Sequence, residues 1–206
     1  MNLSSYIWII ILAAGFSVRM GERNKLLLPV STEESLLRHI VRKAVSVNCG
    51  GIIVVLNPSY YNMKNEICDL PVNIVWNEKA YLGMSTSIKK GVESLPDKAS
   101  GAVIMLADQP DINPQVIKRL IKFYNRNNVS IAQVTYQGQP AHPVLFDKVW
   151  FSKLKKLKGD QGGKTIIEKH IDKRRLLHMS QPPPEDIDTL EDYQKISLRR
   201  GLIYEI

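Results

Sequence analysis

A short segment near the start of the chain combines small residues with two cations, directly after an apolar run. Residues 7–12 are all apolar, residues 13–15 read Ala-Ala-Gly, and Arg19 and Lys25 follow. Small residues let a ligand approach the backbone closely, and the backbone N–H groups can then point at it. With two positive charges beside it, such a loop is suited to holding the polyphosphate of a nucleotide.

This loop matches neither of two standard phosphate-binding motifs. A P-loop has four residues between its first glycine and Gly-Lys, whereas five residues separate Gly15 from Gly21, and Lys25 comes four after Gly21. The dinucleotide fingerprint G-x-G-x-x-G needs three glycines that this segment lacks. A turn that merely follows a core strand is the alternative interpretation.

Carboxylates that could hold a divalent cation occur in two distant segments. Asp108 follows directly on the apolar residues 102–107, and residues 186–192 contain several acids. Mg²⁺ prefers carboxylate oxygens and usually keeps water and substrate phosphate as its other ligands. Each segment also has a structural interpretation, because Asp and Pro are typical of turns, and Thr189 with Asp192 is typical of a helix start.

Strand-like and helix-like segments alternate along the chain, and this order predicts the fold. Continuous apolar or β-branched runs predict strands at 7–12, 52–56, 72–76, 102–107, 130–136 and 143–146. Helical spacing predicts helices at 36–45, 61–68, 85–95, 114–124, 149–157 and 165–170. Such alternation indicates an α/β protein with a three-layer, Rossmann-like, mostly parallel sheet. Ligands bind at the carboxyl ends of such strands, so the loops after residues 12, 76 and 107 should share one rim.

Bulk composition is that of an ordinary globular protein, and residues 1–206 are expected to form a single domain. The net charge of +8 favours anionic partners. The basic stretches 153–158 and 173–175 have no interleaved aromatic residues, which favours a solvated face over nucleic-acid binding. The apolar run is too short to cross a bilayer and has no signal-peptide features, so we expect a cytoplasmic protein without a membrane partner.

The segment 12–25, which reads L-A-A-G-x-S-x-R-M-G-x-x-x-K, resembles the signature of molybdenum cofactor nucleotidyltransferases, especially the cytidylyltransferases. Four further segments resemble the family's patterns: G-M-S-x-S at 83–87, D-Q-P at 108–110, P-x-H-P-x-L-F at 140–146 and G-D-x-G-G at 159–163. A fifth, D-I-D-T-x-E-D, lies at 186–192, so the resemblance covers nearly the whole chain.

The resemblance implies a role for particular residues. The residues expected to act in catalysis are Arg19, Lys25 and Asp108. Mg²⁺ is expected on Asp108 and Asp188, with Asp186 as the alternative to the latter. Contacts to the nucleotide are expected from Leu12, Ala13, Ala14, Gly15, Arg19, Lys25, Gly83, Met84 and Ser87. The acceptor is expected near His142 and Asp160, although a histidine between prolines is more often structural.

The implied reaction is transfer of a nucleoside monophosphate to a phosphate monoester, with pyrophosphate as the leaving group. CTP is the favoured donor, because residues 13–15 read Ala-Ala-Gly where guanylyl relatives tend to read Ala-Gly-Gly. The implied acceptor is the phosphorylated molybdopterin cofactor, with a molybdenum hydroxylase as a further partner. Three alternatives stay open: a guanylyltransferase of the same cofactor, a sugar-phosphate nucleotidyltransferase and a non-catalytic cofactor chaperone.

Overall fold

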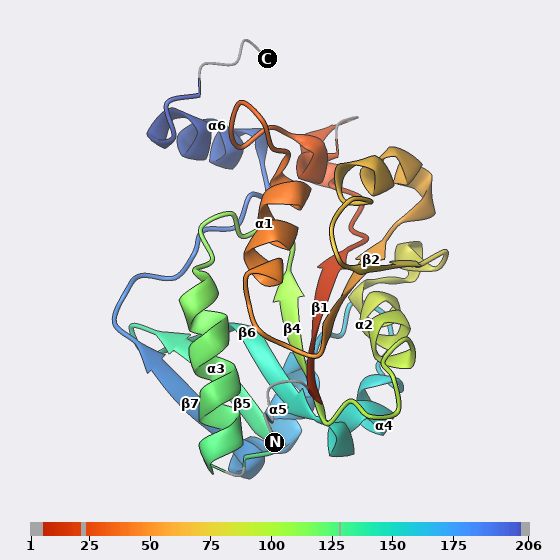
Figure 1. Ribbon diagram of the computed structural model, residues 1–206, viewed down its shortest axis with the longest axis vertical. Helices are drawn as coiled ribbons and strands as arrows, with labels where there is room; N and C mark the ends of the chain where they lie inside the picture. Colours follow the sequence, from red (N-terminus) through yellow and green to blue (C-terminus); the bar gives the residue numbers. More distant parts are fainter. Residues whose placement is uncertain (1–5, 22–23, 128, 203–206) are drawn as a thin grey trace.

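The computed structural model describes residues 6–21, 24–127 and 129–202, and its centre is a seven-stranded sheet (Figure 1). The strand order is β3-β2-β1-β4-β6-β5-β7. The strands are β1 (Ile7–Ala13), β2 (Gly51–Leu56), β3 (Asn73–Trp76), β4 (Gly101–Leu106), β5 (Ile131–Tyr136), β6 (Gln139–Asp147) and β7 (Arg174–Met179). Pairing is parallel throughout except along β6, which runs antiparallel to both β4 and β5. The mostly parallel sheet predicted from the sequence is therefore confirmed.

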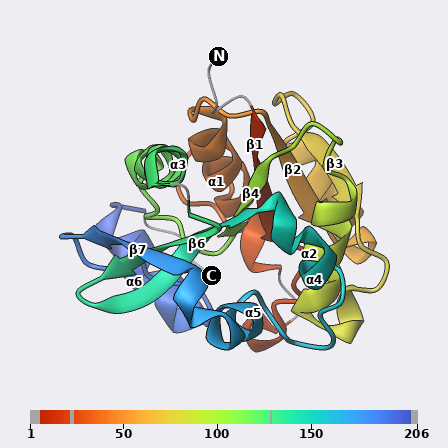
Figure 2. The same cartoon turned by 90° about the horizontal axis from the view of Figure 1, so that it is seen from below.

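Helices cover both faces of the sheet and complete the three layers (Figure 2). The α-helices are α1 (Leu36–Val45), α2 (Met84–Glu93), α3 (Pro114–Asn127), α4 (Phe151–Leu154), α5 (Lys164–Lys169) and α6 (Leu190–Arg199). Short 3₁₀ helices are η2 (Val18–Met20), η3 (Lys25–Leu27), η4 (Pro58–Glu66), η5 (Ala80–Leu82), η6 (Lys148–Trp150) and η7 (Ile171–Lys173). Side chains of α1, α3 and α6 share one apolar core, and those of α2, α4 and α5 share the other.

The first strand lies at the centre because its side chains are apolar in both directions. It pairs with β2 on one side and β4 on the other, and Ile9, Ile10 and Ile11 are completely buried. Alternate side chains of a strand point to opposite faces, so Ile9 and Ile11 enter one core and Ile10 the other. A strand apolar at every position suits a site between two helical layers.

The predicted helix after residue 113 shows how local signals set an element's start. The side chain of Asn113 accepts a hydrogen bond of 2.9 Å from the backbone N–H of Gln115, and Pro114 is the first helical residue. Proline suits that position because its missing N–H would have no partner within the helix anyway. From there α3 buries one apolar face against the sheet.

Several predicted elements differ from the observed ones. The helix predicted at 61–68 is the 3₁₀ helix η4, and the one predicted at 149–157 is η6 followed by the short α4. The edge strand β7 was not predicted, because its first residues, Arg174 and Arg175, resemble a solvated basic stretch. Parallel pairing with β5 makes it a strand, and the Arg174 guanidinium donates a 3.2 Å hydrogen bond to the Gln133 side chain. Tertiary pairing here overrides local composition.

Candidate functional site

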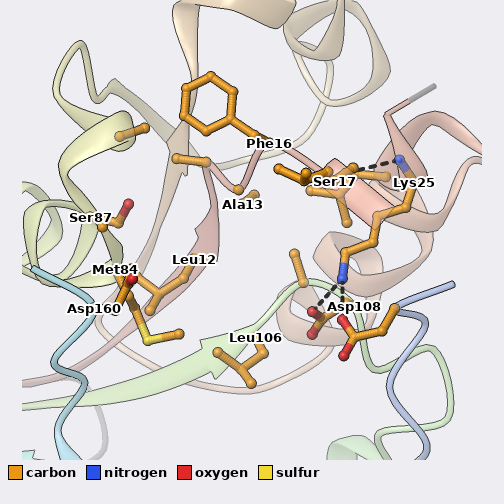
Figure 3. Close-up of a pocket in the computed structure, with 18 of the residues that line it drawn as sticks. Leu12, Ala13, Phe16, Ser17, Lys25, Met84, Ser87, Leu106, Asp108 and Asp160 are labelled. Carbon is orange, nitrogen blue, oxygen red and sulfur yellow. Dashed lines mark hydrogen bonds and ion pairs between the residues drawn. The ribbon is translucent and has the colours of Figure 1, made fainter. Parts of the chain in front are cut away.

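A cavity of about 440 Å³ opens at the carboxyl ends of β1 and β4 (Figure 3). Chain connections from these neighbouring strands diverge there, which is the usual ligand position in a doubly wound sheet. The loops after β1, β3 and β4 all reach it, as predicted from the strand order. Residues predicted as site residues that line it are Leu12, Ala13, Ala14, Gly15, Arg19, Lys25, Gly83, Met84, Ser87, Asp108, Asp160 and Asp188.

Hydrogen bonds hold the loop after β1 in an open cradle. Ser17 adopts a left-handed conformation with φ of 52°, and its hydroxyl accepts a 3.2 Å hydrogen bond from the backbone N–H of Lys25. This contact closes the loop on itself and fixes the start of η3. On the far side, Asn57 donates to the carbonyl of Ala14 and Tyr60 donates to that of Phe16. Neither Asn57 nor Tyr60 was predicted as a site residue, although the place of Asn57 at the end of a buried strand was a usable signal.

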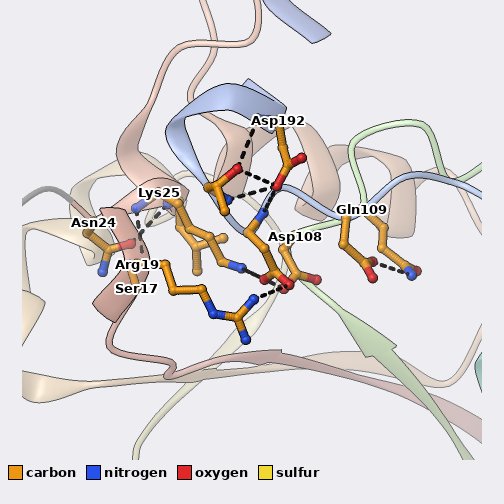
Figure 4. Close-up of polar contacts among 11 residues, drawn as sticks. Ser17, Arg19, Asn24, Lys25, Asp108, Gln109 and Asp192 are labelled. Atoms are coloured by element: carbon orange, nitrogen blue, oxygen red, sulfur yellow. Dashed lines mark hydrogen bonds and ion pairs between the residues drawn. The ribbon is translucent and has the colours of Figure 1, made fainter. Parts of the chain in front are cut away.

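Lys25 lies between two carboxylates from distant parts of the chain (Figure 4). Its ammonium nitrogen is 2.8 Å from Oδ2 of Asp108 and 3.0 Å from Oδ1 of Asp188. Arg19 reaches the other oxygen of Asp188 at 3.1 Å, but from a side chain that is 71% exposed. Burial lowers the pKa of Lys25, but the charges and hydrogen bonds of Asp108, and then of Asp188, outweigh this and raise it above its ordinary value. The lysine is therefore firmly cationic at neutral pH.

The segment that carries Asp188 is fixed by its own backbone and by the start of α6. The N–H of Ile187 donates a 2.9 Å hydrogen bond to the carbonyl of Asp108, which joins this segment to the end of β4. Thr189 and Asp192 form the reciprocal capping box predicted from the sequence, so that helix start is confirmed. Asp192 also accepts from the N–H of Asp188 at 3.2 Å. Asp186, in the same segment, accepts a hydrogen bond of 2.8 Å from the Gln109 side chain.

The opposite wall of the cavity is uncharged apart from Asp160, and Figure 3 shows Met84, Ser87 and Asp160 facing Lys25 and Asp108 across Leu12. The buried Asn77 side chain donates 2.9 Å hydrogen bonds to the hydroxyls of Thr86 and Ser87, which fixes the first turn of α2. The helix predicted at 85–95 begins one residue earlier, at Met84, with Gly83 as its N-cap. Ser85 lies buried inside the first turn, because its N–H donates to the carbonyl of Gly159.

Close backbone contact between Gly83 and Gly159 shapes this wall. Gly83 has φ of 103°, and a methyl group there would lie 2.4 Å from the carbonyl carbon of Gly159 and 2.6 Å from Oδ1 of Asp160. Only glycine tolerates both this backbone conformation and this contact.

We therefore expect Gly83→Ala to push the 159–160 segment away from α2, to lower stability by roughly 1–3 kcal/mol and to raise the KM for substrate about tenfold. Thermal unfolding and steady-state kinetics measure the two effects. Gly138→Ala is the matched control, because Gly138 has φ of 83° but no atom of the described residues lies within 4 Å of the added carbon. If the two variants lost the same stability and showed the same rise in KM, the cause would be backbone strain and not the contact with Gly159.

His142 does not line the cavity with Asp160, the other predicted acceptor residue. It belongs to β6 and is outside the residues that line the cavity, with Nδ1 3.4 Å from the carbonyl oxygen of Ile104. Burial lowers its pKa, and the Ile104 carbonyl and Asp108 offset this only in part. Antiparallel pairing of β6 with β4 directs this histidine against the neighbouring backbone, which corresponds to its structural interpretation.

A Rossmann-like sheet with a cationic cradle at the end of β1, and with one carboxylate after β4 and another before α6, is the arrangement of a nucleotidyltransferase. Residues 9–174 match the family described as the MobA-like NTP transferase domain, and the chain belongs to this family. The predicted family, fold class and enzyme class are thus confirmed.

Relatives span nearly the whole chain. The purine catabolism protein PucB of Bacillus subtilis is 28% identical over 203 residues, which are 94% of this chain and 97% of PucB. The crystal structure of the Mycobacterium sp. strain JC1 homologue of Rv0371c superposes with a TM-score of 0.86 at 29% identity, and covers 96% of this chain and 98% of that one. A manganese complex of Mycobacterium tuberculosis Rv0371c has a TM-score of 0.80 at 25% identity, over 93% and 97% of the two chains. Within the described ranges, no helix of this chain is long and apolar enough to cross a membrane.

Proposed function

We propose that this nucleotidyltransferase transfers CMP from CTP to the terminal phosphate of a molybdopterin-type cofactor and releases pyrophosphate. The observation that carries the proposal is the cluster in which Lys25 bridges Asp108 and Asp188 beside the small-residue loop. Phosphoryl transfer needs positioned reactants and neutralised charge more than covalent chemistry. The acceptor phosphate attacks the α-phosphorus, and pyrophosphate leaves in line.

In this proposal each side of the cavity has its own task. Lys25 and Arg19 neutralise the triphosphate and the leaving pyrophosphate. Backbone groups of residues 12–15 and of Gly83–Met84, with the Ser87 hydroxyl, hold the nucleoside. Asp160, on the same wall as Gly83 and Met84, is assigned to the acceptor, and His142 packs against the backbone of β4 without contacting substrate.

Asp108 and Asp188 suit a Mg²⁺ ion in this scheme. Oδ1 of Asp108 is buried and has no hydrogen-bond partner among the described residues. Buried carboxylate oxygens usually have a partner, so this oxygen is available to a metal ion. No group of three or more His, Cys, Asp or Glu side chains that could hold a metal ion forms in the part of the chain that the structure describes. In this proposal the protein therefore supplies two carboxylate ligands. That fits Mg²⁺, which keeps water and phosphate as its remaining ligands and supplies charge neutralisation to the triphosphate.

Two observations support the choice of substrates. The buried Ala13 and Ala14 give the loop its Ala-Ala-Gly form, which resembles the cytidylyl and not the guanylyl members of the family. PucB, which aligns over almost its whole length, is named for purine catabolism. Hydroxylation of purines is a reaction of molybdenum hydroxylases such as xanthine dehydrogenase, and these would use the dinucleotide cofactor that this chain is proposed to make.

Pyrophosphate release from CTP or GTP, with molybdopterin and Mg²⁺, tests the proposal. We expect release with CTP and a preference of at least about tenfold over GTP, as differential contacts to a base edge commonly supply. A preference for GTP would make the enzyme a guanylyltransferase, and activity only with sugar phosphates would reassign the acceptor. Cofactor binding without release from any nucleotide would support the chaperone alternative.

A further inference from the structure

A second hollow, of about 880 Å³, lies beside the catalytic cavity. It lies between α2, with the segment before it, and the loop that follows α4; α2 and α4 contact each other and are adjacent in Figures 1 and 2. We call it the lysine groove, because six lysines line it: Lys79, Lys89, Lys90, Lys155, Lys156 and Lys158. The proposed catalytic residues do not line it, so it has no part in the reaction described above.

Positive charge in the lysine groove is largely uncompensated. Its lining includes six lysines against two acids, Glu78 and Glu93. Among the residues that the structure describes, Lys89 alone of the six forms an ion pair, with Glu93 at 3.9 Å. The stretch 153–158 by itself predicts a solvated basic face. The fold instead turns three of its lysines toward three others from residues 79–90, which concentrates the charge around one concave surface.

The size and lining of the groove restrict what it can hold. Its volume falls within the range of roughly 300–1,000 Å³ of sites for small ligands and cofactors. Leu82 and Leu157 add apolar surface between the charged groups. A polyphosphate chain with an attached ring system would complement both the excess of cations and this apolar surface.

We propose that the lysine groove is a second binding site, for a nucleoside polyphosphate, distinct from the catalytic cavity. The two hollows share a wall. Leu82 and Ser85 line the groove, whereas Gly83 and Ser87 line the cavity. Likewise, Gly159 lines the groove and its neighbour Asp160 lines the cavity. A ligand in the groove therefore contacts the segment that shapes the nucleoside side of the catalytic cavity.

Calorimetric titration of the full chain with inorganic tripolyphosphate, without added metal, tests the site. We expect two binding sites per chain, one in the cavity and one in the groove. The triple variant Lys155→Glu, Lys156→Glu and Lys158→Glu should lose the groove site, with affinity reduced about tenfold or more, and keep the cavity site. Lys25→Met should lose the cavity site and keep the groove site. Lys118→Glu, Arg119→Glu and Lys122→Glu, exposed on α3 over the other face of the sheet, change the net charge equally and should retain both sites.

A parallel titration with ATP tests the nucleoside part of the proposal. Tighter binding of ATP than of tripolyphosphate in the groove supports a nucleoside ligand, and equal or weaker binding overturns that part. A wild-type chain in which no site is weakened by the triple lysine variant would overturn the proposal, whereas loss of the cavity site alone would count against the proposed function only. Equal losses in the groove variant and the α3 variant would also overturn the proposal, since net charge would then account for the binding. Because no turnover is measured, these outcomes are independent of the proposed reaction.

Discussion

Asp108→Asn is expected to lower the rate of pyrophosphate release roughly 10³-fold, because it removes a charged ligand from the proposed Mg²⁺ site. The substitution keeps the shape of the side chain. An asparagine oxygen can still accept from Lys25, so the ion pair of 2.8 Å becomes an ordinary hydrogen bond. The backbone carbonyl that holds Ile187 is unchanged. The loss should therefore appear in catalysis and in metal binding, with little change in thermal stability.

Asp186→Asn is the matched control for that experiment. Asp186 lies two residues from Asp188, but its Oδ1 accepts a hydrogen bond from Gln109. Burial raises the pKa of Asp186, and although the hydrogen bond from Gln109 lowers it, the nearby charges of Asp108 and Asp188 keep it above its ordinary value. We expect less than about a tenfold loss of rate. Binding of Mn²⁺, followed by its electron paramagnetic resonance signal, should fall in Asp108→Asn and stay nearly unchanged in Asp186→Asn. The opposite pattern would move the metal to Asp186.

The sheet and its rim could be predicted because their signals are local. Runs such as residues 7–12 and 102–107 are apolar at every position, which marks strands that are covered on both faces. The rule for ligands in parallel sheets then placed three loops together, and all three line the cavity. The helix start at Thr189 could be predicted equally well, because its capping box joins residues only three positions apart.

Contacts between distant segments could not be predicted from composition or spacing. Lys25 and Asp188 are separated by 163 positions, and resemblance to a family suggested that they act at one site without showing that they touch. The edge strand β7 depends on pairing with β5, and the backbone contact of Gly83 with Gly159 has no sequence signature. The lysine groove is a further case, since residues 155–158 are a simple basic stretch until the fold sets α2 opposite them.

Lys25→Met is expected to have opposite effects on turnover and on metal binding. Turnover should fall about 10²–10³-fold, because the triphosphate and leaving group lose one of the two cations proposed to neutralise them. Affinity for Mn²⁺ without nucleotide should rise, by about tenfold or more, because the ammonium no longer occupies the space between the two carboxylates. In the free enzyme its nitrogen lies 2.8 Å from Oδ2 of Asp108 and 3.0 Å from Oδ1 of Asp188, so lysine and metal compete for the same two carboxylates.

This competition implies an order of events in the wild-type enzyme. A metal ion enters fully only when an incoming triphosphate draws the Lys25 ammonium away from Asp108, so nucleotide and metal should bind with positive coupling. Lys25→Met should abolish that coupling. Lys25→Arg keeps the charge and should keep the weak Mn²⁺ affinity of the free enzyme. Arg19→Met, which removes a largely exposed cation that pairs with Asp188, should change Mn²⁺ affinity much less. Weaker Mn²⁺ binding in Lys25→Met than in the wild type would show that the lysine organises the carboxylates for the metal and does not compete with it.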